Sequence, residues 1–179
     1  VQQYVDVGFN PRGVVIFRVS PGLNGYDETR SRALYEQLIS RIRSAPGIRG
    51  VALSHVGLLS GAVNSTSIFV QGRAYQPREH NNEIYRLVIS PGFFETMEMP
   101  LLLGRGFTDR DHANAPKVVV INEAAARKYF PGEHPVGRRF GTSAETTAEL
   151  EIVGVLRDAR YDSVRDPAPP TMYMPYTQR

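Results

Sequence analysis

The residue types that most often carry out chemistry are few in this sequence and far apart. No two histidines fall within four residues of each other, and no HExxH motif is present, so the spacing of zinc ligands is missing: the histidines are His55, His80, His112 and His134. The chain has no cysteine, which removes thiolate nucleophiles, disulfides and cysteine-based metal sites. His55 lies in an apolar stretch, where a satisfied core or edge histidine is expected more often than a ligand. The sequence therefore predicts no metal ligand.

Four carboxylates lie close enough in the sequence to be considered as a site: Glu95, Glu98, Asp109 and Asp111. A pair of carboxylates could serve as acid and base in hydrolysis, and a group of carboxylate oxygens could hold calcium. A calcium loop of the EF type needs Asp or Asn at alternate positions, a central Gly and a distal Glu, whereas DRDHANAPK supplies only the first pair. The pattern favours a solvated turn with a local ion pair to Arg110. A hydrolase that uses Asp109 or Asp111 is kept as an alternative.

Two motifs that combine glycine with arginine, GRGF (104–107) and GRRF (137–140), raise the question of a phosphate site. A phosphate cradle needs a helix N-terminus directly behind it to supply free amides. GRGF is instead followed by TDRDHANAP, which is acidic and rich in turn formers. We therefore expect the glycines to allow positive φ at tight bends. Phe107 and Phe140 should be buried beside them, and Arg105 should spread across a neighbouring carbonyl or carboxylate.

Motifs for nucleophilic catalysis or nucleotide binding are also missing. Ser60 in LLSGA lacks the glycines of a G-x-S-x-G elbow and an obvious helix after it. The sequence contains neither a Walker loop nor G-x-G-x-x-G. We therefore expect no catalytic residue and no cofactor-binding residue.

The overall composition is that of an ordinary folded protein. The 179 residues are 41% hydrophobic and 22% charged, enough for one domain or two small lobes. The net charge is +3, and acids interrupt the basic residues everywhere, so we expect no nucleic-acid partner. No apolar run approaches the ~18 residues of a transmembrane helix. Because the chain begins at Val1 without an initiator methionine or a signal-peptide core, we expect a piece processed or excised from a longer protein.

A strand, a helix and a second strand are expected in the first 56 residues. GVVIFRVS (13–20) is typical of a strand. The helix expected for residues 29–44, capped by Asp27 or Thr29, carries apolar residues at every fourth position: Leu34, Leu38 and Ile42. IRGVALSHV (48–56) predicts the second strand.

The rest of the chain is expected to alternate between strands and short helices. We expect residues 66–72 and 83–90 to form a hairpin with a long tip and residues 101–111 to form a loop. One short helix should lie within residues 91–99, and another should follow an Asn122 cap. The remaining strands are expected at residues 117–121, 149–161 and 171–176.

Several motifs together resemble one known family. They are SPGFF (90–94), GRGF (104–107), INEAAARKYFPGEHPVG (121–137), and VGVLRDAR (153–160) followed by YMPY (173–176). Their combination spans nearly the whole chain and is far more specific than any single motif. It resembles the periplasmic core domain of MacB-type permeases of ABC transporters, also called FtsX-like permeases. The sequence is most similar to the large ATPase-free permeases of this group with duplicated halves.

The resemblance implies an α+β fold of two lobes. One is a porter-like lobe built from strand, helix, strand units, and the other is a smaller inserted α/β lobe. On this expectation residues 1–90 plus 150–179 form the porter-like lobe, and residues 91–149 form the inserted lobe. The residue composition of the sequence changes near Ser90 and Leu150, which agrees with this division.

The resemblance also implies a role without catalysis. The family places this domain between the first two transmembrane helices of a permease half, on the extracytoplasmic (periplasmic) side of the bacterial cytoplasmic membrane, and assigns it no catalytic residues. A cytoplasmic ABC ATPase moves the membrane helices, and the outer domain couples that motion to substrate export or to extracytoplasmic partners. The expected partners are the permease's own transmembrane helices, the ATPase, and a periplasmic adaptor or second permease half.

The alternative is a ligand-binding extracytoplasmic module. A cleft between the lobes, near GLLSGAVNS (57–65), would then hold a small molecule or peptide.

Overall fold

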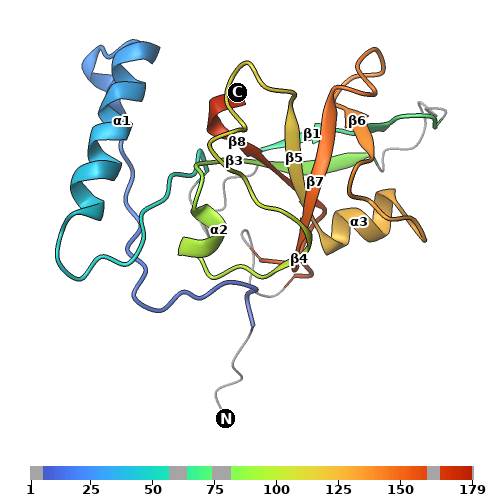
Figure 1. Ribbon diagram of the computed structural model, residues 1–179, viewed down its shortest axis with the longest axis horizontal. Coiled ribbons are helices and arrows are strands. Elements are labelled where there is room, and N and C mark those ends of the chain that lie inside the picture. The colour runs from blue at the N-terminus through green and yellow to red at the C-terminus, as the bar shows by residue number, and fades with distance from the viewer. Residues whose placement is uncertain (1–5, 57–63, 74–81, 161–165, 179) are drawn as a thin grey trace.

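The structure is a computed structural model that describes residues 6–56, 64–73, 82–160 and 166–178. Within them one eight-stranded mixed sheet dominates, and a long helix stands apart from it (Figure 1). In chain order the elements are the 3-10 helix η1 (Pro21–Asn24), α1 (Glu28–Arg43), β1 (Ser65–Ser67), β2 (Phe69–Val70), β3 (Glu83–Ile89), α2 (Phe93–Thr96), β4 (Leu101–Gly104), β5 (Val118–Asn122), α3 (Glu123–Tyr129), β6 (Arg139–Gly141), β7 (Leu150–Leu156), β8 (Thr171–Pro175) and the 3-10 helix η2 (Tyr176–Gln178). The mixed class expected from the sequence is confirmed.

The sheet curls until its two ends belong to one segment of chain. The strand order is β1-β3-β8-β5-β7-β6-β2, and β4 pairs with β7 beside this path. β1 and β2 stand at opposite ends of the order, yet only Ile68 separates them in the sequence. β1 is antiparallel to β3, and β2 is antiparallel to β6. The segment 65–70 therefore joins the two edges and closes the sheet on itself.

The sheet has a hydrophobic core on each face. Along β5, Val118 and Val120 belong to one buried cluster, while Val119 and Ile121 belong to the other. This alternation follows from the period of two in a strand, and an uninterrupted apolar run is what a strand covered on both faces requires. α2 supplies Phe93 and Phe94 to the first cluster, and α3 supplies Ala125 and Tyr129 to the second. Each large apolar side chain buried in this way contributes roughly 1.5–3 kcal/mol.

Two helices begin at the caps that the sequence predicts. Asp27 Oδ1 accepts a hydrogen bond from the Arg30 N–H at 2.8 Å, before α1. Asn122 Oδ1 accepts one from the Ala125 N–H at 3.0 Å, before α3. Each cap satisfies one of the N–H groups that a helix start leaves free, which is worth about 1 kcal/mol.

The strand, helix, strand unit expected near the N-terminus is only partly formed. α1 confirms the helix, but the predicted strands 13–20 and 48–56 are wrong for this chain, because both segments are irregular apart from one antiparallel bridge between Ser54 and Ile89. A strand needs a neighbouring strand, whereas a helix makes its hydrogen bonds internally. α1 has no buried residue and stands at the left of the view, away from the sheet (Figure 1).

Three other elements differ from the expectation. Residues 101–104, predicted as part of a loop, form β4 and pair with β7. The predicted strand 66–72 is broken at Ile68, because its two halves pair with different strands, although the hairpin of β1 with β3 is confirmed. The predicted strand 149–161 ends at Leu156.

The sheet draws strands from both parts of the predicted division of the chain. β5 and β6 come from residues 91–149, and β5 lies between β8 and β7, which come from residues 150–179. The division into residues 1–90 plus 150–179 and residues 91–149 stays a prediction, and the sheet does not follow it.

Candidate functional site

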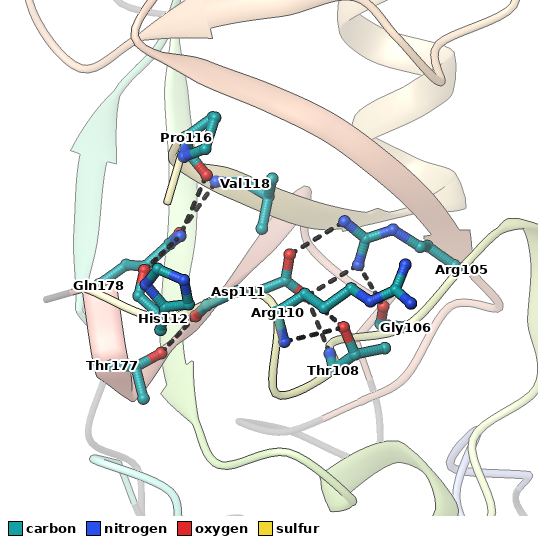
Figure 2. A network of polar contacts seen from close by, with 10 residues as sticks. All are labelled: Arg105, Gly106, Thr108, Arg110, Asp111, His112, Pro116, Val118, Thr177 and Gln178. Atoms are coloured by element: carbon teal, nitrogen blue, oxygen red, sulfur yellow. Dashed lines mark hydrogen bonds and ion pairs between the residues drawn. The ribbon is translucent and has the colours of Figure 1, made fainter. Parts of the chain in front are cut away.

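The loop that joins β4 to β5 carries the arginine and the carboxylates singled out in the sequence. Figure 2 shows Arg105, Thr108 and Asp111 pointing toward one another within this loop. It also shows the loop residues His112 and Pro116 facing Gln178, which comes from the end of the chain.

Arg105 and Asp111 form a bidentate ion pair. Arg105 Nη1 donates to Asp111 Oδ2 at 2.8 Å, and Arg105 Nη2 donates to Oδ1 at 2.9 Å. The Thr108 N–H donates to Oδ2 at 2.8 Å, and Arg105 Nη1 also donates to the Gly106 carbonyl at 3.0 Å. The Asp111 side chain is 4% exposed, whereas that of Arg105 is 47% exposed. The prediction that Arg105 binds a neighbouring carbonyl or carboxylate is confirmed, because its guanidinium donates to both kinds of group.

Opposing effects act on the pKa of Asp111. Burial favours the neutral acid and so raises the pKa, while the hydrogen bonds from Arg105 and Thr108 and the charge of Arg105 lower it. The lowering effects win, so the pKa of Asp111 lies below its ordinary value. A carboxylate that stays ionised and is surrounded by donors cannot give up a proton near neutral pH. The geometry therefore suits Asp111 to hold the loop together. Asp109 and Arg110 form an exposed turn, as predicted, but the predicted ion pair with Arg110 is wrong, because Asp111 pairs with Arg105.

Thr177 and Gln178, near residue 179, form hydrogen bonds with the other side of this loop. The buried Gln178 accepts from the Val118 N–H at 3.0 Å through Oε1, and its Nε2 donates to the carbonyls of His112 at 3.2 Å and Pro116 at 3.0 Å. The Thr177 hydroxyl donates to the Asp111 carbonyl at 2.6 Å. One side chain thus satisfies two main-chain carbonyls of the loop and the first N–H of β5, which keeps buried backbone polar atoms paired.

The glycine and phenylalanine positions of both arginine motifs have the predicted structural role. Gly104 has φ 70°, and a Cβ built on it would lie 2.1 Å from the Val153 carbonyl oxygen. Gly137 has φ 88°. Phe107 and Phe140 are both buried. Glycine is needed at position 104 both for its backbone angle and for this close approach to β7.

The other carboxylates of the candidate set do not join Asp111. Asp109 and Glu95 are exposed, and Glu98 accepts a hydrogen bond from Asn10 Nδ2 at 2.8 Å. Within the described residues no three metal-ligating side chains come together. The candidates therefore form neither a carboxylate dyad nor an oxygen cage.

The histidines are equally dispersed. His55 is exposed beside β3, where its N–H donates to the Val88 carbonyl at 2.9 Å. His112 and His134 are exposed on separate loops. His80 and Ser60 lie outside the described residues, as does most of the segment 57–65 in which a ligand cleft was expected.

A shallow hollow lies beside residues 6–12, near the start of the described chain. Its volume is about 290 Å³, and charged or amide side chains line it, including Asp6, Asn10, Glu98 and Arg157. These groups pair with one another, since Arg157 Nη2 lies 2.7 Å from Asp6 Oδ2 and Asn10 bonds to Glu98. The hollow therefore presents few unsatisfied groups to a ligand.

Sequence reasoning missed the residues that make the longest connections. Gln178 and Thr177 lie sixty or more positions from the groups they bind. Asn122, predicted only as a cap, also accepts from the Thr171 N–H at 2.8 Å and donates to the Pro169 carbonyl at 2.9 Å. A local pattern cannot reveal such contacts. The one available signal is that Asn122 is an amide side chain at the end of an apolar run, whereas the sequence around Thr177 and Gln178 offers none.

Comparisons with known proteins agree on one family. The family model for the MacB-like periplasmic core domain matches residues 1–179. The chain is 44% identical over 67 residues to a protein of Syntrophobacter fumaroxidans (strain DSM 10017 / MPOB) described as the macrolide export ATP-binding/permease protein MacB. That match covers 37% of this chain and 9% of the relative, so the chain spans only a small part of that relative's length.

Solved structures share the fold at low sequence identity. The periplasmic region of MacB from Actinobacillus actinomycetemcomitans superposes with a TM-score of 0.55 at 19% identity, covering 80% of this chain and 55% of that region. The extracellular domain of the noncanonic ABC-type transporter YknZ from Gram-positive bacteria gives 0.52 at 23%, covering 79% and 62%. A domain of a putative permease from Porphyromonas gingivalis gives 0.51 at 18%, covering 78% and 56%.

No helix in the described ranges has both the length and the apolar character needed to cross a bilayer. The family model matches every residue of the chain. The described side chains that could act as catalysts or metal ligands either lie apart from one another or hold the loop between β4 and β5 together. The chain belongs to the family of MacB-like periplasmic core domains.

Proposed function

We propose that this chain is the extracytoplasmic domain of an ABC transport permease, and that it acts mechanically and not as an enzyme. It couples movement of transmembrane helices in its parent protein to substrate export or to a partner outside the membrane. The observation that carries the proposal is the match of the family model to residues 1–179. The ATP hydrolysis that drives such movement would take place on a separate cytoplasmic subunit.

The structure supports a mechanical role in two ways. The closed sheet is buried on both faces, so its parts are held together as one packed unit. The buried carboxylate of the candidate site is held by Arg105 and Thr108 and is not presented to a substrate. Both features favour a body that moves as a whole over a pocket that performs chemistry.

The first test is the parent reading frame. We expect an apolar span of about twenty residues on each side of the extracytoplasmic region, with further spans beyond it. Polar flanks throughout the parent protein would contradict the proposal.

The second test measures motion. Because the chain has no cysteine, single cysteines can replace the exposed Asp109 beside the sheet and the exposed Gln37 on α1, and a spin label on each reports the distance to a label in the parent's membrane helices. We expect those distances to change when the parent transporter is moved from its nucleotide-free state to an ATP-bound state. A matched sample in which the ATPase subunit cannot bind ATP controls for labelling effects. Distances that stay fixed in every nucleotide state would refute the coupling role.

A further inference from the structure

One asparagine in the sequence is followed directly by glycine. This pair, Asn24 and Gly25, ends the 3-10 helix η1 and leads into α1. Asparagine is among the chemically labile residues of proteins, because the main-chain nitrogen of the next residue can attack its side-chain amide and close a five-membered ring. A Cβ on that next residue hinders the attack, and glycine has none. The pair is therefore the place in this chain where the side-chain amide is most easily lost.

The surroundings of the pair leave room for the reaction. Asn24 and Gly25 are both exposed, and the neighbouring Leu23 is 88% exposed. A Cβ built on Gly25 would meet no atom within 4 Å, so the space beside the attacking nitrogen is open. The side-chain amide of Asn24 has no hydrogen-bond partner among the described residues. Nothing described therefore holds this amide away from the nitrogen that would attack it.

The hydrogen bonds that hold the turn are long. The Gly25 N–H donates to the Gly22 carbonyl at 3.1 Å, and the Tyr26 N–H donates to the Pro21 carbonyl at 3.4 Å. The first of these is a bond of the 3-10 type, whose geometry is poorer than that of an α-helical bond. Exposed turns with few buried contacts open at little cost in free energy. Opening of this turn frees the Gly25 nitrogen for the attack.

We propose that Asn24 is a site of spontaneous deamidation in the folded chain. The Gly25 nitrogen bonds to the side-chain carbonyl carbon of Asn24 and gives up its proton, and the carbon–nitrogen bond of the side-chain amide breaks, so that ammonia leaves with that proton. Water then opens the resulting succinimide at either of its two carbonyls. One opening gives aspartate, and the other gives isoaspartate, in which the main chain runs through the former side chain. One water is consumed and one ammonia is released, without an oxidant or a reductant.

Either product changes the start of α1. Each product adds a negative charge shortly before Asp27 and Glu28, at the N-terminus of the helix, where negative charge is favourable. Isoaspartate also lengthens the main chain by one carbon, so the hydrogen bonds of Gly25 and Tyr26 across the turn cannot both be kept. The turn lies beside α1 and away from the sheet (Figure 1). We therefore expect the sheet to stay folded after the modification.

Asn114 offers a matched comparison within the same chain. It is exposed, and the N–H of the next residue, Ala115, donates to the His112 carbonyl at 3.0 Å. Asn24 and Asn114 thus share an exposed side chain and a hydrogen-bonded amide after it. They differ in the Cβ of the following residue, which alanine has and glycine lacks. A difference in rate between the two positions therefore reports the effect of Gly25.

The test follows both positions over time. The chain is kept folded in mildly alkaline buffer, and peptide mass spectrometry measures the small mass increase that accompanies the replacement of an amide by an acid. Fragmentation of the same peptides distinguishes aspartate from isoaspartate. A synthetic peptide of residues 18–30 gives the rate without the fold. We expect Asn24 to convert at least about tenfold faster than Asn114, and at a rate within about tenfold of that in the peptide.

Asn24→Gln is the matched variant, because the longer side chain would have to close a larger and less favourable ring. It should remove the product at position 24 and leave the rate at Asn114 unchanged. The variant alters an exposed side chain, so unchanged thermal unfolding verifies that it folds.

Three outcomes would overturn the inference. The first is conversion of Asn24 at less than about tenfold the rate of Asn114, because Gly25 would then give no advantage. The second is conversion in the folded chain more than about tenfold slower than in the peptide, because the turn would then protect the site. The third is a product that persists in Asn24→Gln, because the modified residue would then lie elsewhere. None of these outcomes bears on the proposed function, which does not depend on this site.

Discussion

Replacing Asp111 by alanine tests the structural role of the loop between β4 and β5. The change removes a carboxylate that is 4% exposed and that accepts two hydrogen bonds from Arg105 and one from the Thr108 N–H. Hydrogen bonds to a charged group contribute roughly 1.5–3 kcal/mol each when buried. Because Arg105 is half exposed, water can hydrogen-bond to its guanidinium after the carboxylate is removed. The contribution of the Arg105 bonds to stability is therefore reduced in this figure. We expect Asp111→Ala to lower the free energy of unfolding by about 2–4 kcal/mol.

Urea unfolding followed by circular dichroism measures this change. Asp109→Ala is the matched control, because Asp109 is the same residue type on the same loop but is exposed, and it should alter the free energy by less than about 0.5 kcal/mol. Arg105→Ala should also destabilise, and combining it with Asp111→Ala should cost less than the sum of the two single changes. An Asp111→Ala protein as stable as the control would refute the reasoning. So would an Arg105→Ala protein that stays fully stable yet loses binding of an anion.

The pH dependence gives an independent check with a definite sign. The pKa of Asp111 is lower in the folded protein than its ordinary value, so the folded state favours the ionised form. The stabilisation is therefore complete above the unfolded pKa of about 3.9 and is lost as the pH falls through the folded pKa. The gap in unfolding free energy between the unmodified chain and Asp111→Ala should be constant from pH 7 to about 5 and shrink below about 4. A gap that stays constant down to pH 3 would contradict the assigned ion pair.

Three further substitutions test other contacts, each by the same unfolding measurement. Gly104→Ala should destabilise the chain by more than about 2 kcal/mol, because φ is 70° and the new Cβ would lie 2.1 Å from a carbonyl oxygen. Gly106→Ala is the control and should be nearly neutral, because its Cβ would lie 3.5 Å from the nearest atom. Equal effects of the two changes would count against the close approach of Gly104 to β7. Asn122→Ala should cost about 2–4 kcal/mol because it removes a helix cap and two further hydrogen bonds, and a cost under about 1 kcal/mol would show that these bonds are not formed together. Gln178→Ala should cost about 1–3 kcal/mol because it leaves the Val118 N–H unpaired, and a neutral result would mean that the end of the chain is not fastened to β5.

Local chemistry was the part of the structure that the sequence could predict. A cap depends on one side chain and the backbone three residues later, so Asp27 and Asn122 could be identified from neighbouring residues alone. The burial of Phe107 and Phe140 followed from their place after a glycine turn. The mixture of strands and short helices followed from the apolar runs and the turn residues between them, whereas the α+β class was implied by the family resemblance.

Contacts between distant segments could not be predicted, for three separate reasons. The break at Ile68 depends on which strands lie at the two edges of the sheet, which no local pattern encodes. The local sequence predicts an ion pair to Arg110 within the turn, whereas the fold brings Arg105 to Asp111. Residues 13–20 have the composition of a strand but no partner strand in the described chain, so composition alone predicted the wrong structure for them.

The closed sheet has a consequence for how the molecule withstands force. An open sheet fails most easily when its outermost strand is peeled away, one hydrogen bond at a time. Here the two ends of the strand order meet in the single segment 65–70, so pulling on that segment loads its pairing with β3 and with β6 together. Ile68, 2% exposed between them, must leave the core before either side can separate. A tether attached near this segment should therefore tear the sheet in one step and not unzip it.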